Sequence, residues 1–233
     1  TIEGLLYDKK ILVDKAARYF AAAGKVYLAE RIAAESALRG ADLESLAESL
    51  MKKIDGYKVM RCKGCSNRKL FLNAVTPEGL VSFADDFFAD CTVHGVYTEE
   101  GIGANALLAS LQQKSNAQGI ETESFYNPLD PGKIEYLHLP QVKHAFVVTD
   151  GIFVYRGRVD ERVDLMSCIN TKMFGRIKMD IERDSELFDR LLEKVMETML
   201  VTKSIHNNIE EIYVGAMDFG RVDEMTEGLI EAL

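Results

Sequence analysis

The chain has 233 residues, of which 47% are hydrophobic and 28% charged, a composition typical of a globular protein with one or two domains and not of a disordered chain. Asp and Glu (37) outnumber Lys and Arg (28), and the net charge of -9 repels nucleic-acid phosphates and anionic lipid. The four cysteines are too few for a disulfide framework, and no apolar run approaches the ~20 residues that span a bilayer. We therefore expect a cytoplasmic protein that partners neither nucleic acid nor a membrane.

The first 55 residues are predicted to form a helical hairpin. From about Asp8 to Leu38 apolar residues recur at helical spacing, and no proline interrupts them. Gly40 ends this helix and Asp42 can cap the next one. The apolar face of that second helix consists of Leu43, Leu46, Leu50, Met51 and Ile54.

Residues 56–233 are predicted to form a three-layer α/β domain with a mostly parallel sheet and a C-terminal helical tail. The tail is indicated by apolar residues at three- and four-residue intervals from about Ser185 to Met217. The core is indicated by short β-rich segments that Pro, Gly and Asn separate. These segments are Leu70–Val75, Cys91–Tyr97, Ile120–Tyr126, His144–Thr149 and Ile152–Tyr155.

The two helical ends of the chain resemble each other. Residues 30–32 align with residues 210–212, and Gly40 aligns with Gly220. After a one-residue gap Leu43, Leu46, Leu50 and Ile54 fall on Val222, Met225, Leu229 and Leu233. Either two amphipathic helix pairs match by chance, or residues 1–55 are the tail of a preceding half and the rest is a second half. In the second case we expect a companion half upstream of Thr1.

The segment after the Cys91–Tyr97 strand has the order of a phosphate-binding loop. Gly101 and Gly103 precede a good helix-forming stretch, residues 104–113. In such loops glycines let backbone N–H groups converge on an anion at the helix N-terminus. The order therefore predicts a strand, a phosphate loop and a helix.

The side chains of a working phosphate loop are missing. The pattern G-x-x-x-x-G-K-[ST] needs Lys and a hydroxyl where this chain has Ala104 and Asn105, and its first Gly is Thr98. Glu99 and Glu100 add two carboxylates where a polyphosphate would lie. ATP and Mg²⁺ are therefore disfavoured at this loop.

Several motifs together resemble an uncharacterised family of bacterial P-loop ATPases built from two tandem halves. They are residues 73–83 (with Thr-Pro-Glu-Gly), the loop, residues 127–133 (with Leu-Asp-Pro), Leu139-Pro140 and residues 205–219. The resemblance implies a P-loop NTPase fold and a nucleotide site, but the family's loop ends G-T-G-K-S-T. The degenerate site it implies here comprises Gly101, Gly103, Ala104, Asn105, Ala106 and Asp150.

Asp150 ends the apolar segment that starts at Ala145. Such a carboxylate at the mouth of a parallel sheet can hold Mg²⁺ through water. The alternative is that Asp150 only starts a turn with Gly151.

Three weaker signals have simpler explanations. Cys62 and Cys65 have the spacing of a zinc ribbon without a second pair, so a turn with two free thiols is the alternative. The basic residues between Lys52 and Lys69 fit a solvated face. His206 and Glu210 are spaced for a local hydrogen bond or salt bridge. No catalytic nucleophile motif is found.

Three functions remain as hypotheses. The first is a pseudo-NTPase half that shapes or regulates an ATP-binding companion, either an upstream half or a second copy. The second is an active ATP hydrolase or kinase-like phosphotransferase with an atypical loop. The third is an interaction scaffold that binds no nucleotide.

Overall fold

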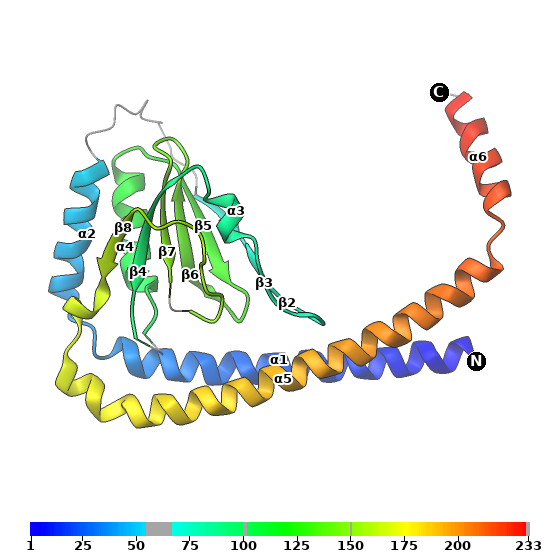
Figure 1. The fold of residues 1–233 in the computed structure, drawn as a ribbon, viewed down its shortest axis with the longest axis horizontal. Helices are drawn as coiled ribbons and strands as arrows, with labels where there is room; N and C mark the ends of the chain where they lie inside the picture. The colour runs from blue at the N-terminus through cyan, green and yellow to red at the C-terminus, as the bar shows by residue number, and fades with distance from the viewer. Residues whose placement is uncertain (55–66, 100–101, 150, 232–233) are drawn as a thin grey trace.

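The computed structural model describes residues 1–54, 67–99, 102–149 and 151–231. Figure 1 shows an α/β head at one end of two long helices that lie side by side, α1 (Ile2–Glu35) and α5 (Thr171–Ala216). The helix α2 (Gly40–Ile54) rises along the head, whereas α6 (Phe219–Glu231) rises at the other end of the pair and stands apart. None of the helices in the described ranges is both long and apolar enough to cross a bilayer.

The head contains a six-stranded, mostly parallel sheet with the strand order β1-β5-β6-β7-β4-β8. The pairs β5–β6 and β6–β7 are antiparallel, and the other three pairs are parallel. Its strands are β1 (Asn67–Leu70), β4 (Thr92–Tyr97), β5 (Thr122–Asn127), β6 (Asp130–Leu139), β7 (His144–Val148) and β8 (Glu161–Asp164). The expected α/β fold with a mostly parallel sheet is confirmed.

Helical elements cover both faces of this sheet. On one face α2 and α4 (Asn105–Ala117) share the largest apolar core with β4, β6 and β7. On the other face a smaller core forms beneath the short helix α3 (Ala84–Phe87), where Phe88 packs edge to face against Phe125 and Tyr136. A hairpin of β2 (Asn73–Thr76) and β3 (Gly79–Ser82) extends from this side toward the long helices.

The two N-terminal helices do not form the expected hairpin. The apolar stripe of α1 faces α5, where Tyr27 lies 5.5 Å from Phe188 between ring centroids. The stripe of α2 faces α4 instead, and Leu50 and Ile54 are buried in the core of the head. A hairpin needs both stripes to face each other. Because each stripe has a different partner, α2 belongs structurally to the head and α1 to the long helical pair.

The strand assignments differ from the sequence-based expectation at several places. The segment Ile152–Tyr155 is not a strand, because β8 takes the place beside β4 at the edge of the sheet. The expected strand Leu70–Val75 is divided between β1 and β2. The ten-residue strand β6 was not predicted, because its Pro131 and Gly132 are residues typical of turns. After β8 a short 3-10 helix (Leu165–Cys168) leads into α5.

Candidate nucleotide site

The predicted order of strand, glycine-containing loop and helix is confirmed. β4 ends at Tyr97 and α4 begins at Asn105, after Ala104, whose side chain provides no cap. Because β4 and β7 are parallel neighbours, both strands end at the edge of the sheet under which α1 passes. This edge is where open α/β sheets bind ligands. Of the predicted site residues, Gly101 and Asp150 lie outside the described residues, as does Glu100.

A side chain from α1 fills the space against the buried Gly103. A Cβ added at Gly103 would collide with Nη1 of Arg31. The guanidinium carbon of Arg31 lies 4.3 Å from the centroid of the Tyr27 ring, which is a cation–π distance. The start of α4, where a phosphate loop would hold its anion, is therefore in contact with a cation of the protein itself.

A buried carboxyl group interacts electrostatically with this cation. Glu135 on β6 is buried, and Oε2 accepts a hydrogen bond of 3.1 Å from Nδ2 of Asn73. Burial raises the pKa of Glu135 to about 7, and the positive charge of Arg31 opposes this rise. A helix N-terminus disfavours a cation, and attraction to the ionised form of Glu135 offsets part of this cost.

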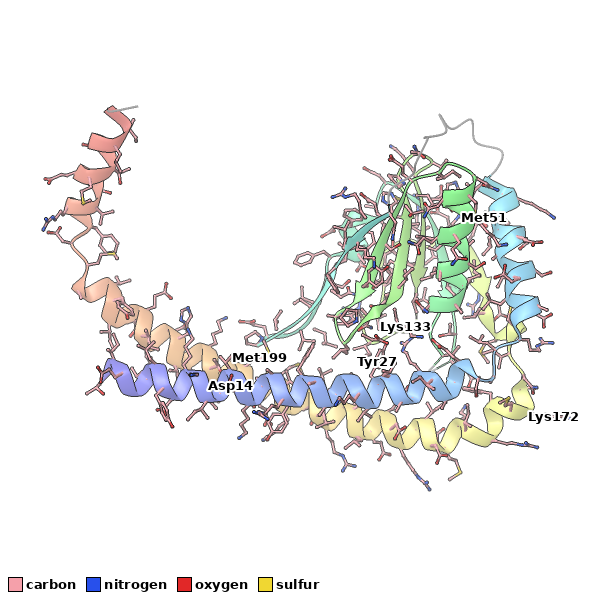
Figure 2. The ribbon with its side chains drawn as sticks, turned by 180° about the vertical axis from the view of Figure 1, so that it is seen from behind. Asp14, Tyr27, Met51, Lys133, Lys172 and Met199 are labelled. Carbon is pink, nitrogen blue, oxygen red and sulfur yellow. The ribbon has the colours of Figure 1, made fainter. Side chains whose placement is uncertain are left out.

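The surrounding polar groups are bound to each other. Oδ1 of Asn105, at the position of the Mg²⁺-binding hydroxyl, accepts a 2.8 Å hydrogen bond from the backbone N–H of Ile134. Lys133 donates to both carboxylate oxygens of Glu35 at 2.8 and 3.0 Å. Figure 2 shows Tyr27 and Lys133 at this junction between α1 and the head. The cavity between them measures about 10 Å³, which is room for at most one water molecule. Its lining residues are Tyr27, Arg31, Ala104, Asn127, Lys133, Ile134, Glu135 and Val148.

Two expected features of the loop are placed differently. Glu99 was expected where phosphate would lie, but its carboxylate pairs with Lys178 of α5 at 3.2 Å. It is therefore held toward α5. Ala106 is partly buried and packs against the core of the head. What occupies the start of α4 is thus the guanidinium of Arg31, which the loop sequence alone did not predict.

A signal for Arg31 was present in the alignment of the two helical ends. Arg31 falls on Glu211 there, between one matching residue on each side, Glu30 on Glu210 and Ile32 on Ile212. A change from acidic to basic within an otherwise similar segment points to a position whose surroundings differ between the two ends. Glu135 gave no comparable signal, because a single acidic residue in a segment of mixed polarity resembles any solvated position.

The weaker candidates are not brought together into a site. Nδ1 of His206 accepts a 3.1 Å hydrogen bond from Lys9 of α1, so its partner is across the helical pair. No group of three or more His, Cys, Asp or Glu side chains suited to a metal occurs among the described residues, and Cys62 and Cys65 lie outside them. Within the basic stretch Lys53 pairs with Glu161 and Arg68 with Glu123.

A buried histidine pair lies at a distance from the loop, on β4 and β7. Nε2 of His94 and Nδ1 of His144 are 2.7 Å apart, and the His94 ring stacks on Phe146 with centroids 4.5 Å apart. Burial and the neighbouring His144 lower the pKa of His94 to about 4, although Glu161 lies 3.4 Å from its Nδ1. The pair is therefore uncharged at neutral pH.

Comparisons with known proteins provide no information on the function of this site. No family model, no curated protein and no solved structure matches the chain.

Proposed function

We propose that this chain is a pseudo-NTPase: a P-loop NTPase-like half whose degenerate loop does not bind ATP and which shapes or regulates an ATP-binding companion half. The observation that carries the proposal is the contact of Arg31 with Gly103 at the start of α4. A working loop places a lysine of its own in this region to reach the β- and γ-phosphates. Here the cation comes from another helix, α1, and interacts electrostatically with the buried Glu135.

The chemistry of the remaining groups supports an inactive site. Backbone N–H groups and the helix dipole remain for an anion, whereas the lysine and the Mg²⁺-binding hydroxyl are absent. A charge-assisted bond of the kind lost with the lysine contributes roughly 1.5–3 kcal/mol. This loss alone weakens binding about 10- to 100-fold, and the cavity beside Arg31, of about 10 Å³, is too small for a phosphate group.

Calorimetric titration with Mg·ATP tests the proposal. The wild-type chain is expected to give no binding heat at millimolar ATP. The matched variant combines Arg31→Ala, Ala104→Lys and Asn105→Ser, so that the cation moves from α1 into the loop while the net charge is kept. We expect this triple variant to bind Mg·ATP measurably, and Arg31→Ala alone to remain without binding.

Two results would contradict the proposal in different ways. A micromolar dissociation constant for the wild-type chain would favour the atypical ATPase or phosphotransferase. A triple variant that is folded by circular dichroism and still does not bind ATP would favour the nucleotide-independent scaffold. The exposed apolar face of α6 favours an interaction role in either case.

A further inference from the structure

The long helices α1 and α5 are related by an approximate two-fold symmetry that the repeat makes visible. They run antiparallel, and Lys9 contacts His206 while Tyr27 contacts Phe188. The repeat places residue 32 on residue 212, a shift of 180 residues. Any antiparallel pair keeps its register when such a shift exchanges the two helices, so the shift only sets the position of the two-fold axis. For a shift of 180 residues the axis lies between the Lys9–His206 and Tyr27–Phe188 contacts.

The helices that follow α1 and α5 obey the same relation. After α1 the chain turns within residues 36–39 into α2, and after α5 it turns within residues 217–218 into α6. Figures 1 and 2 show α2 and α6 rising to the same side from opposite ends of the pair. The head occupies the space next to α2, and the corresponding space next to α6 holds no part of the described chain.

The apolar stripe of α6 matches the buried stripe of α2 but is exposed. On α2 the stripe packs into the core of the head, and Leu50 is 4% exposed; its counterpart on α6, Leu229, is 67% exposed. An isolated helix of this length is marginal in water, and a contiguous apolar face of this kind marks an interaction site. The exposed stripe consists of Val222, Met225, Leu229 and Ile230, whose counterparts on α2 in the sequence alignment are Leu43, Leu46, Leu50 and Met51.

Charged residues beside the stripe are also matched. On α2 Glu44 lies 3.0 Å and Glu48 3.8 Å from Nζ of Lys114 on α4. Their counterparts on α6 are Asp223 and Glu227, which keep both negative charges in the same register. A partner of α6 therefore needs an apolar helix face flanked by a cation, which is the face that α4 presents to α2.

We propose that α6 is a clasp that docks on the α4-like helix of a second α/β head of this type, seated over the C-terminal half of α5. The proposal rests on the companion half of the proposed function and names the surface through which this chain holds it. A second copy of this chain in the same conformation offers no such face, because its α4 is already covered by α2. The occupant is thus a head whose α4-like helix lacks a cover of its own.

An apolar groove at the middle of the helical pair lies where the two heads would meet. Figure 2 shows Asp14 and Met199 near this midpoint. The groove has a volume of about 460 Å³, and the tip of the β2–β3 hairpin of the present head forms one of its walls. The two-fold relation brings the corresponding hairpin of a second head to the same place. Its apolar lining includes Val13, Ala16, Phe20, Val75, Pro77, Val195 and Met199.

A graft tests whether the α6 sequence binds an α4 face. In the full chain, residues 42–54 are replaced by the sequence of residues 221–233, and thermal unfolding is followed by circular dichroism. If α6 is equivalent to α2, the graft unfolds cooperatively within roughly 10 °C of the wild type, since a few conservative core changes shift Tm by that amount. The matched control is the same graft with Val222→Ser, Met225→Ser and Leu229→Ser, which is expected to lose its cooperative transition.

Reversing the charges beside the stripe tests whether the graft packs on α4 specifically or only through its apolar residues. In the graft, Asp223→Lys with Glu227→Lys is expected to lower Tm by about 2–4 °C, and adding Lys114→Glu is expected to restore it. A graft that unfolds like its serine control, or a reversal that Lys114→Glu does not rescue, overturns the equivalence of α6 and α2.

Sedimentation of the wild-type chain tests the occupant. We expect a monomer, and the same result for the wild-type background carrying the three serine substitutions in α6. A wild-type dimer that the serine variant loses would assign the face to a second copy and overturn the proposed occupant. None of these measurements involves nucleotide, so their failure is distinct from a failure of the ATP titration.

Discussion

The buried carboxylate of Glu135 is expected to make the stability of the protein fall as pH rises. Its pKa is about 7 in the folded chain against an ordinary value of 4.5, because burial disfavours the charged form. Below pH 4.5 Glu135 is protonated in both the folded and the unfolded state, so the free energy of unfolding is not reduced. Between pH 4.5 and 7 the unfolded state releases its proton while the folded state keeps it, so the unfolding free energy declines.

The magnitude follows from the separation of the two pKa values. Each unit corresponds to about 1.4 kcal/mol, so the loss is about 1 kcal/mol at pH 5 and about 3 kcal/mol at pH 8. In Glu135→Gln this titration is absent. The difference in unfolding free energy between wild type and variant should therefore change by about 2–3 kcal/mol over this range, in favour of the variant at high pH.

Urea denaturation at a series of pH values between 5 and 8 measures this difference. Any fixed cost of the Gln side chain beside Arg31 cancels, because only the change with pH is compared. The control is Glu3→Gln, which removes an exposed carboxylate in the first turn of α1 and is measured over the same pH range. A Glu135→Gln difference that does not change between pH 5 and 8 would refute the assignment of a raised pKa to this carboxylate.

Three further expectations concern packing and protonation. A Cβ in Gly24→Ala would lie 2.8 Å from a backbone carbonyl oxygen in the β5–β6 turn, so urea denaturation should show that the free energy of unfolding falls by about 1–3 kcal/mol. The Cβ of Gly175→Ala in α5 meets open space, so this substitution should raise the free energy of unfolding by up to about 1 kcal/mol. Leu108→Ala in the core against α2 should lower the unfolding free energy by about 2–5 kcal/mol in the same assay. The pKa of His94 is lowered to about 4, so the stability that is present above pH 6.5 is lost as the pH falls toward 4. Between pH 7 and pH 4.5 the Tm of His94→Gln should therefore fall less than the Tm of the wild type. An equal fall in both proteins would contradict this expectation.

Periodicity predicted the helices and the inner parallel strands because their burial follows from residues close in sequence. Apolar runs such as His144–Val148 are buried on both faces of the sheet, and such runs are recognisable without knowledge of their neighbours. The loop between Tyr97 and Asn105 was also predictable, since glycines before a helix-forming stretch are a local signal.

The features that the sequence did not predict depend on contacts between residues far apart in the chain. The partner of α2 is α4, about sixty residues further along the chain, and no local pattern distinguishes it from α1 as a packing surface. Arg31 reaches Gly103 from a helix far away in sequence, so a motif search confined to the loop could find only what the loop lacks. The sequence therefore showed that the loop lacks phosphate-binding side chains, but it did not predict the contact of Arg31 with Gly103.

The pairing of α1 with α5 has a consequence for synthesis of the chain. Tyr27 and Phe188 are separated by about 160 residues, which a ribosome takes roughly 10–30 s to add. Throughout this interval the apolar side of α1 has no α5 to pack against, and closing so long a loop is also slow once both helices exist. We expect the helical pair to form last, so that a nascent chain depends on chaperones or on an early partner for α1 until α5 leaves the ribosome.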